Sequence, residues 1–223
     1  MAHQPDAAIV GIRRMMLPGF FEGTEMPETG WWEALWSDPA RVIRDAGVAP
    51  DMTVVDLCCG NGWFTLQLAR IARAIVAIDI DSKLLASARV RLTESGLTNC
   101  AFVEANAYDV ATVVRDPVDH VFLANAFHGV PDKPRLARAV HDVLKPGGLF
   151  AIVNWHARPR EETTVLDEPR GPATDLRMTP EETIAAVQPS ALVLRRQIEI
   201  PPFHYAVVFE RGLVAAKVGA YAP

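Results

Sequence analysis

The stretch Val54-Val-Asp-Leu-Cys-Cys-Gly-Asn-Gly-Trp63 (VVDLCCGNGW) joins a short apolar run to a helical pattern through a bend that contains two glycines. Residues 53–57 are mostly β-branched and apolar, which favours a buried strand. Apolar side chains recur at helical spacing after Gly62. A glycine-containing bend between a strand and a helix brings backbone N–H groups and the positive end of the helix dipole together. The stretch therefore predicts a binding site for a nucleotide-like or carboxylate-bearing ligand.

A second acidic residue lies at the end of the next apolar run. Asp79 closes residues 74–78, and a carboxylate at that point of a parallel sheet can accept hydrogen bonds from both hydroxyls of a ribose. No Gly-Lys-Ser/Thr follows the first bend, so a phosphate-binding P-loop is not indicated. Cys58 stands where the dinucleotide-binding fingerprint requires its first glycine, which argues against that motif as well.

Apolar runs and helical patterns alternate along most of the chain. The expected strands are residues 53–57, 74–78, 100–104, 120–124 and 149–155. One helix is expected to begin with Ser82 as its cap and to end with Gly96 at the C′ position, and another helix is expected to end at Lys145-Pro-Gly-Gly148. Such alternation predicts a parallel, doubly wound sheet with helices on both faces.

The C-terminal part departs from this alternation. Residues 156–178 form a long polar segment rich in proline, which suits a functional or mobile loop. It ends at a capping box made by Thr179 and Glu182, with Pro180 at the first helical position. The apolar runs 192–200 and 204–209 follow with no room for a helix between them, so we expect them to pair antiparallel.

Composition limits the class of protein. The 223 residues are 50% hydrophobic and 22% charged, which suits a globular chain with a sizeable core. The net charge of −5 lacks the broad positive field of a nucleic-acid-binding protein. No apolar run is long enough for a membrane span, and there is no signal-peptide pattern, so we expect a soluble cytoplasmic protein. Three cysteines predict neither a disulfide framework nor a metal site.

These residues resemble the motifs of the class I S-adenosylmethionine-dependent methyltransferases, in the order and spacing of that family over roughly residues 50–155. The matching stretches are Asp56 to Gly62, Ala77 to Leu85, Phe102 to Ala107, Asp119 to His128 and Val143 to Phe150. The subgroup that the chain resembles is that of small-molecule enzymes similar to the quinone-biosynthesis methyltransferases. The resemblance implies a Rossmann-like, doubly wound seven-stranded sheet, mostly parallel with an antiparallel last strand.

The resemblance also implies which residues hold S-adenosylmethionine. Gly60 and Gly62 would hold its methionine end, Asp79 its ribose, and Ile80 would lie against the adenine. The full implied cofactor set is Asp56, Cys58, Gly60, Asn61, Gly62, Asp79, Ile80, Asn106, Ala107 and Asn125. Two positions depart from the family pattern. Cys58 replaces a glycine, and Asn106 replaces the aspartate that accepts from the adenine amino group, although an Asn carbonyl can also accept.

The acceptor side is expected at the carboxyl ends of the central strands. His128 is the candidate general base there, and the candidate acceptor-binding residues are Trp31, Trp155, His156, His204 and Tyr205. We expect His128, His156 and His204 to converge, either as polar ligands of the acceptor or as a three-imidazole metal site. Three unrelated, locally bonded histidines are the simpler alternative. No metal is assigned.

Two parts of the chain are expected to differ in role. Residues 1–36, with three tryptophans near their end, are interpreted as a cap that closes over the site, and residues 37–223 as the methyltransferase domain. The implied reaction is methyl transfer to a small molecule, which leaves S-adenosylhomocysteine, with no nucleic acid or membrane as partner. A cofactor sensor without turnover and an RNA or protein methyltransferase are the alternatives.

Overall fold

The computed structural model describes residues 29–213. Residues 1–28, which include most of the expected cap, and residues 214–223 lie outside the described part. The helices are α1 (Thr29–Leu35), α2 (Pro39–Asp45), α3 (Trp63–Ile71), α4 (Ser82–Glu94), α5 (Val110–Val113), α6 (Lys133–Val143) and α7 (Pro180–Val187). The strands are β1 (Thr53–Leu57), β2 (Ala74–Asp79), β3 (Cys100–Glu104), β4 (Val118–Ala124), β5 (Leu144–Trp155), β6 (Thr164–Val165), β7 (Glu168–Pro169), β8 (Leu192–Ile200) and β9 (His204–Arg211).

The main sheet of the described part has seven strands in the order β3-β2-β1-β4-β5-β9-β8. The first five strands in this order run parallel to one another, and β9 runs antiparallel to both of its neighbours. This confirms the expected doubly wound, mostly parallel sheet with an antiparallel last strand. Because β1 is central and the chain continues on either side of it, the carboxyl ends of β1, β2, β4 and β5 all meet at one edge.

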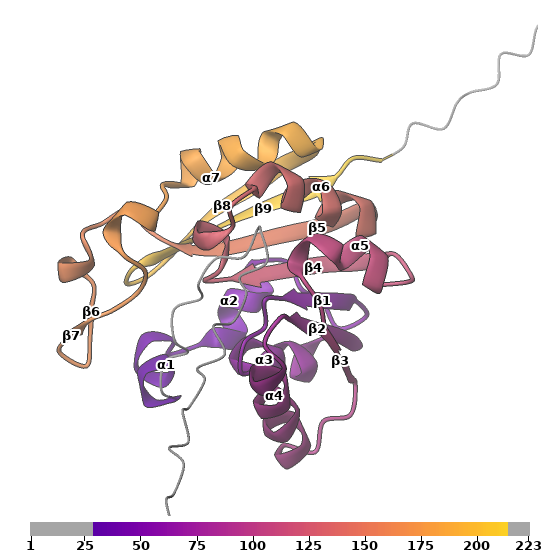
Figure 1. Cartoon of the computed structure of the whole chain (residues 1–223), viewed down its shortest axis with the longest axis horizontal. Helices are drawn as coiled ribbons and strands as arrows, with labels where there is room; N and C mark the ends of the chain where they lie inside the picture. The colour runs from indigo at the N-terminus through magenta and orange to yellow at the C-terminus, as the bar shows by residue number, and fades with distance from the viewer. Residues whose placement is uncertain (1–28, 214–223) are drawn as a thin grey trace, which may run out of the picture.

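Side chains alternate between the two faces of each strand and build two cores. Val54 and Phe122 belong to the core on the face covered by α2, α3 and α4, while Val55 and Val121 belong to the core on the face covered by α5, α6 and α7. Figure 1 shows these two sets of helices on opposite sides of the sheet. The buried tryptophans of α1 join the first core, so this helix packs onto the domain rather than apart from it.

The helix ends follow local chemistry, with two corrections. Helix α6 ends at Val143 rather than at Lys145 to Gly148, because the backbone is already extended at Leu144, and residues 145–148 belong to β5. The cap of α4 is Asp81 rather than Ser82, because the Asp81 carboxylate accepts from the backbone N–H groups of Lys83 and Leu84. Gly96 follows the helix end with a φ of +69°, as expected for the C′ position. The capping box of α7 is also confirmed, since Thr179 and Glu182 bond reciprocally.

The long polar segment 156–178 is an ordered extension beyond the end of β5. It contains the short hairpin β6–β7, whose turn residues Leu166 and Asp167 both have positive φ. Strand β6 contacts helix α1, and Figure 1 shows both at the same end of the molecule. The extension and α1 therefore cover the carboxyl end of β5 together.

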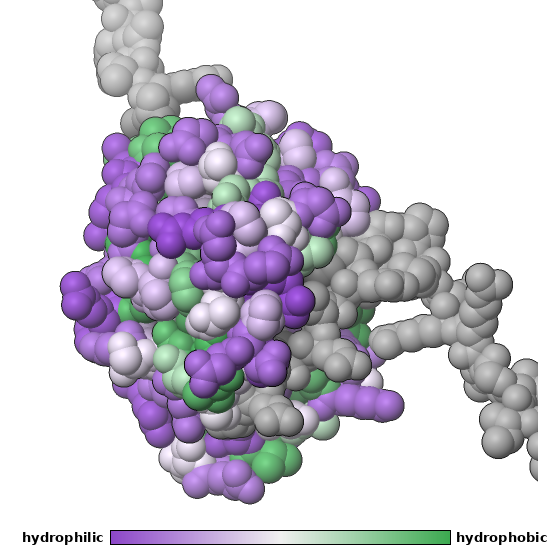
Figure 2. Space-filling model, turned by 90° about the vertical axis from the view of Figure 1, so that its left-hand side faces the viewer, coloured by the Kyte–Doolittle hydropathy of each residue, from purple (hydrophilic) through white to green (hydrophobic). Residues whose placement is uncertain are grey.

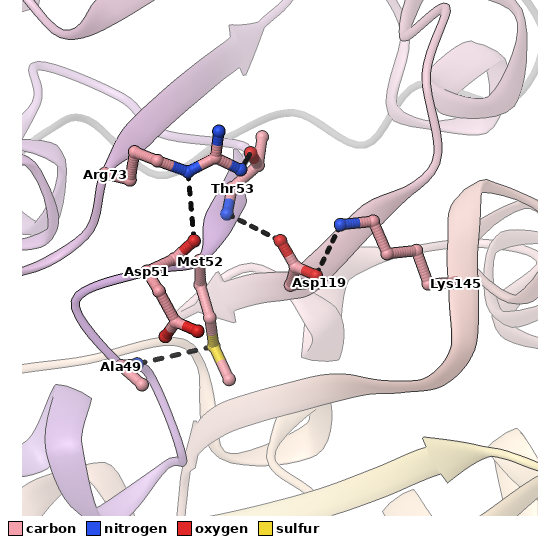
Figure 3. A network of polar contacts seen from close by, with 7 residues as sticks. All are labelled: Ala49, Asp51, Met52, Thr53, Arg73, Asp119 and Lys145. Carbon is pink, nitrogen blue, oxygen red and sulfur yellow. Dashed lines mark hydrogen bonds and ion pairs between the residues drawn. The ribbon is translucent and has the colours of Figure 1, made fainter.

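A polar network holds the opposite edge of the sheet (Figure 3). The Asp119 carboxylate at the start of β4 accepts from the backbone N–H of Thr53 at 2.8 Å and from Lys145 Nζ at 2.6 Å, while Arg73 Nη2 donates to Thr53 Oγ1 at 2.9 Å. These bonds join the amino ends of β1, β4 and β5. Among residues 29–213, no helix is long and apolar enough to cross a membrane.

Candidate cofactor and acceptor site

The bend after β1 has three residues in the left-handed region. The φ angles of Cys58, Gly60 and Gly62 are 60°, 55° and 80°. A Cβ on Gly62 would lie 2.7 Å from the Cβ of Ala88 on α4, so only glycine fits there. Cys58 adopts its conformation with a side chain, at the cost that such a backbone carries for any residue other than glycine. Burial raises the pKa of its thiol, so Cys58 is a neutral thiol at physiological pH.

The Asp79 carboxylate organises the bend from the end of β2. Its Oδ2 accepts from the backbone N–H of Gly60 at 2.8 Å, and its Oδ1 accepts from that of Asp81 at 2.9 Å. A carboxylate oxygen accepts more than one hydrogen bond, so both oxygens can also receive hydroxyl donors. This position suits the ribose-binding role that the resemblance implies.

Asp56 lies beneath the bend and is 2% exposed. The hydroxyl of Thr65 donates to its Oδ2 at 2.6 Å. Burial raises the pKa of Asp56 to about 7; the bond from Thr65 opposes this shift, and the charge of Asp79 adds to it. The Asp79 carboxylate leaves the site acidic, and Asp56 adds negative charge when it is ionised, which suits a cofactor that carries a sulfonium and an ammonium group.

Buried polar atoms without a hydrogen-bond partner test whether a cofactor fits here. Asn61 Oδ1, inside the glycine bend, and the indole Nε1 atoms of Trp63 and Trp32 are buried and unpaired. The two indole rings stack with centroids 6.4 Å apart. Buried polar groups normally have partners. One acceptor and two donors beside the helix N-terminus therefore fit an amino-acid end group, which offers both kinds of partner.

The adenine end is expected beside Ile80 and the segment after β3. Ile80 is half-buried, and so are Asn106 and Ala107. Asn106 Oδ1 accepts from the backbone N–H of Tyr108 at 3.0 Å, where it caps a short 3-10 turn. A carbonyl oxygen has two lone pairs, so Asn106 can accept a second hydrogen bond. The substitution of Asn for Asp is thus compatible with adenine binding.

Asn125 follows β4 in the left-handed region, with a φ of 57°. Its Oδ1 lies 3.1 Å from His204 Nε2, while its Nδ2 is buried and has no partner. The His204 ring packs between two tryptophans, with centroid distances of 4.4 Å to Trp36 and 4.2 Å to Trp155. Trp31 adds an edge contact to Trp155 at 6.2 Å. This face of the carboxyl edge is aromatic.

His128 lies on the other face. It is buried, and its Nδ1 is 3.1 Å from Asn154 Oδ1. Burial lowers the pKa of His128 to about 4; the bond to Asn154 opposes this shift, and the charges of Lys133 and Arg177 add to it. His128 is therefore neutral at physiological pH. That is the protonation state of a general base, although the low pKa makes it a weak one.

The other two candidate histidines divide between the faces. His156 Nε2 lies 2.9 Å from Glu199 Oε2, and its ring is 5.0 Å from that of Tyr205. The Tyr205 hydroxyl is held by α7, at 2.6 Å from Thr183 Oγ1. Residues 154 and 205 pair across β5 and β9 on the face opposite Trp155 and His204. The structure brings all three histidines to one edge but gives each its own partner.

The charges of the other two histidines still affect the pKa of His204. Burial lowers the pKa of His204 well below its usual value, and the charges of His156, Arg177 and His128 lower it further. No group of three His, Cys, Asp or Glu side chains within residues 29–213 is arranged to hold a metal ion. The three-imidazole arrangement considered above is therefore not formed among these residues.

Four side chains at this edge were not identified from the sequence. Asn154 contacts His128, and Trp36 contacts His204. Trp63 follows the glycine bend. The Arg177 guanidinium lies over the ring of Trp155 at 5.2 Å. Asn154 and Trp63 adjoin recognised motifs, so their positions could have been inferred. Trp36 was inside the expected cap. Arg177 sits in a loop without a motif, and only the fold brings it to β5.

Comparison with known proteins agrees with this geometry. A family model described as a methyltransferase domain matches residues 49–182, more than half of the chain. A 2-phytyl-1,4-naphtoquinone methyltransferase of Nostoc sp. is 32% identical over 132 residues, which are 57% of this chain and 56% of that protein. A tRNA 5-carboxymethoxyuridine methyltransferase of Escherichia coli is 25% identical over 124 residues, 55% and 47% of the two chains. The chain thus spans about half the length of the curated relatives it matches.

Solved structures share the fold. A SAM-dependent methyltransferase from Aquifex aeolicus superposes with a TM-score of 0.69 at 20% identity, covering 82% of this chain and 93% of that one. An S-adenosylmethionine-dependent methyltransferase from Mesorhizobium loti gives 0.59 at 22% identity, covering 77% and 96%. The sheet order, the glycine bend with Asp79 and the matching family model agree. The chain belongs to the class I S-adenosylmethionine-dependent methyltransferases.

Proposed function

We propose that this chain transfers the methyl group of S-adenosylmethionine to a small molecule bound where the carboxyl ends of β4 and β5 meet the amino end of β9. The observation that supports this most strongly is the aromatic cluster of Trp31, Trp36 and Trp155 next to the residues that fit the cofactor. Buried aromatic walls with a few polar groups are typical of small-molecule sites.

The chemistry follows from the cofactor. When bound, S-adenosylmethionine supplies an electrophilic methyl group on a sulfonium. A lone pair of an acceptor held in line with the S–CH3 bond would take up the methyl carbon, and the electron pair of the broken bond would remain on sulfur in S-adenosylhomocysteine. The protein's part is to orient the two reactants and to exclude water, which can contribute roughly 7–11 kcal/mol.

We assign His128 as the candidate base, with Asn154 fixing its ring. The candidate acceptor contacts are Trp31, Trp155, His156, His204 and Tyr205. Because the Tyr205 hydroxyl is bonded to Thr183, we assign Tyr205 a supporting role. Because Trp155 and His204 are buried, an acceptor reaches them when α1 moves aside. This is the cap role that we propose for residues 1–36.

An RNA acceptor is the second candidate, and the tRNA-modifying relative favours it. The net charge of −5 opposes it, since RNA binding depends on a positive surface. On the face that includes the β6–β7 end, the coloured residues are mostly hydrophilic with small separate hydrophobic patches (Figure 2), so these described residues form no large apolar surface for a protein partner. The free cysteines suit the reducing cytoplasm that we propose for this chain.

The test is a label-transfer experiment. The purified protein is incubated with S-adenosylmethionine carrying a deuterated methyl group, either with a small-metabolite extract or with total tRNA. We expect the label in a small molecule, detected by mass spectrometry, together with S-adenosylhomocysteine. Label in tRNA alone would show an RNA methyltransferase, and cofactor binding without label in either fraction would show a sensor.

A pair of variants checks the cofactor site. Asp79→Ala removes the proposed ribose acceptor, and hydrogen bonds to charged groups are worth roughly 1.5–3 kcal/mol each, so we expect affinity for S-adenosylhomocysteine to fall at least tenfold in calorimetry. Asp81→Ala is the matched control, because this neighbouring carboxylate caps α4. It should lower stability by about 1 kcal/mol and leave affinity nearly unchanged. Equal affinities in the two variants would contradict the assignment of Asp79.

A further inference from the structure

Arg177 is a buried cation with only neutral partners. Its side chain is held by three bonds, from Nε to the carbonyl of Pro172 at 3.1 Å and from Nη2 to the carbonyl of Arg170 at 2.8 Å and to Thr163 Oγ1 at 2.9 Å. The residue is 6% exposed, and Nη1 is buried without a partner. Within residues 29–213, no ion pair joins Arg177 to a carboxylate.

The surrounding charges do not neutralise it. Burial lowers the pKa of Arg177, the positive charge of Arg160 acts in the same direction, and only the exposed Glu161 opposes them. A guanidinium stays charged in proteins despite such a shift. A buried charge without a counter-ion is costly, so its retention here calls for an explanation.

The position of Arg177 indicates why this buried charge is retained. Its guanidinium lies over the ring of Trp155 at 5.2 Å, and Trp155 contacts His204 and Trp31 in the aromatic cluster. Gly171 permits this arrangement. With a φ of +87°, a Cβ there would lie 2.9 Å from the Trp155 ring and 3.0 Å from Arg177 Nη2. The 156–178 extension thus holds the Arg177 guanidinium in contact with the ring of Trp155.

A second donor beside this cluster also has no acceptor. Asn125 Nδ2 is buried and unpaired, and Asn125 is bonded through its Oδ1 to His204. Together with Arg177 Nη1, the aromatic site therefore offers buried N–H groups in excess. A ligand that satisfied them would have to bring oxygen acceptors, and one that also neutralised Arg177 would have to bring negative charge.

We propose that Arg177 binds a negatively charged oxygen of a flat aromatic methyl acceptor, either a carboxylate or an ionised hydroxyl, whose ring stacks in the Trp31–Trp155 cluster. This inference rests on the proposed small-molecule function and names the acceptor's chemical class. An acceptor that is bound as an anion already has the lone pair that attacks the methyl carbon, so His128 does not have to remove a proton from it. A weakly basic His128 is sufficient for such an acceptor.

The experiment measures charge preference directly. The protein saturated with S-adenosylhomocysteine is titrated with two isosteric pairs, benzoate against benzamide and 2-naphthoate against 2-naphthamide, and with ionised 4-nitrophenol against 4-nitroanisole. We expect the wild-type protein to bind at least one anion about tenfold or more tightly than its neutral partner. The carboxylate and phenolate arms distinguish the two forms of anionic oxygen.

Three variants identify the responsible group. Arg177→Gln should abolish the preference for the anion and change affinity for the neutral partner less than about threefold, while Arg177→Lys should keep part of the preference. Arg160→Gln is the matched control, since it removes the same charge and a bond to Gly171 of the same extension from an exposed side chain. It should leave the preference unchanged.

Each outcome is decisive. If Arg177 only holds the extension in place, Arg177→Gln will weaken anion and neutral ligand equally, and the proposal is wrong. Absence of any anion preference in the wild-type protein, including absence of binding, also overturns it, and this result does not depend on whether a variant folds. Failure of the wild-type protein to bind S-adenosylhomocysteine would instead contradict the proposed function itself.

Discussion

At the scale of single residues, two left-handed glycines near α4 differ in what surrounds them. Gly62 has a φ of +80° and faces Ala88, whereas Gly96 has a φ of +69° and open space within 4 Å of the point that a Cβ would occupy. Both positions penalise any other residue through the backbone, but only Gly62 would also force the glycine bend away from α4. The pair therefore separates backbone strain from packing.

We expect Gly96→Ala to lower the free energy of unfolding by about 1 kcal/mol, and Gly62→Ala to lower it by clearly more, about 2–4 kcal/mol, because overpacking adds to the strain. Urea denaturation checks this difference. Calorimetry should show weakened binding of S-adenosylhomocysteine only for Gly62→Ala. Similar stability losses in both variants would mean that the bend yields to the added methyl group.

At the scale of elements, α1 is too short to be stable alone. It has 7 residues, and isolated helices of that length do not form in water. Its tryptophans Trp31 and Trp32 are 7% and 6% exposed, and Trp32 stacks on Trp63 at the start of α3. Tertiary packing therefore holds α1 in place beside the glycine bend.

We expect Trp32→Ala to lower the free energy of unfolding by about 3–5 kcal/mol, as truncation of a buried aromatic residue does. Glu33→Ala, on the exposed side of the same helix, should change it by less than about 0.5 kcal/mol. Thermal unfolding followed by circular dichroism provides the measurement. An unchanged midpoint for Trp32→Ala would show that α1 opens independently of the domain, as a fully detachable cap would.

At the scale of the whole molecule, the two edges of the sheet have different tasks. The carboxyl edge carries Asp79, the aromatic cluster and Arg177, while the amino edge carries the network around Asp119. Burial alone would raise the pKa of Asp119, but the bonds from Lys145 and Thr53 and the charges of Lys145 and Arg73 outweigh it, so the pKa is lowered. Stability and binding can therefore be altered separately.

We expect Lys145→Met to lower the free energy of unfolding at neutral pH by about 0.5–1 kcal/mol, a value kept small because both side chains are partly exposed. Asp119 has a lowered pKa in the folded state, so its stabilising contribution is present above about pH 4 and is lost as the pH falls through the folded pKa. The difference between wild type and variant should vanish in acid. Affinity for S-adenosylhomocysteine should not change, and a change would contradict the separation of the two edges.

Much of the fold could be predicted from local patterns. The strands expected at 53–57 and 100–104 have the observed bounds, and the capping box of Thr179 is confirmed, because burial period and capping chemistry act over a few residues. The expected cap of α4 lies one residue late, since a serine and an aspartate at adjacent positions are both good caps. Helix α2 was not identified, although Asp38 and Pro39 carry its start signal.

The sequence by itself determined the alternation of strands and helices and the glycine bend, because each depends on residues close together in the chain, and the resemblance of its motifs to a known family indicated the cofactor class. Only the tertiary structure decided the acceptor side. His128 and His204 lie on opposite faces of the sheet because strand alternation separates Asn154 from Trp155. Arg177 reaches Trp155 because the 156–178 extension folds back over the end of β5. Such contacts join residues far apart in sequence and follow from packing, which no local pattern encodes.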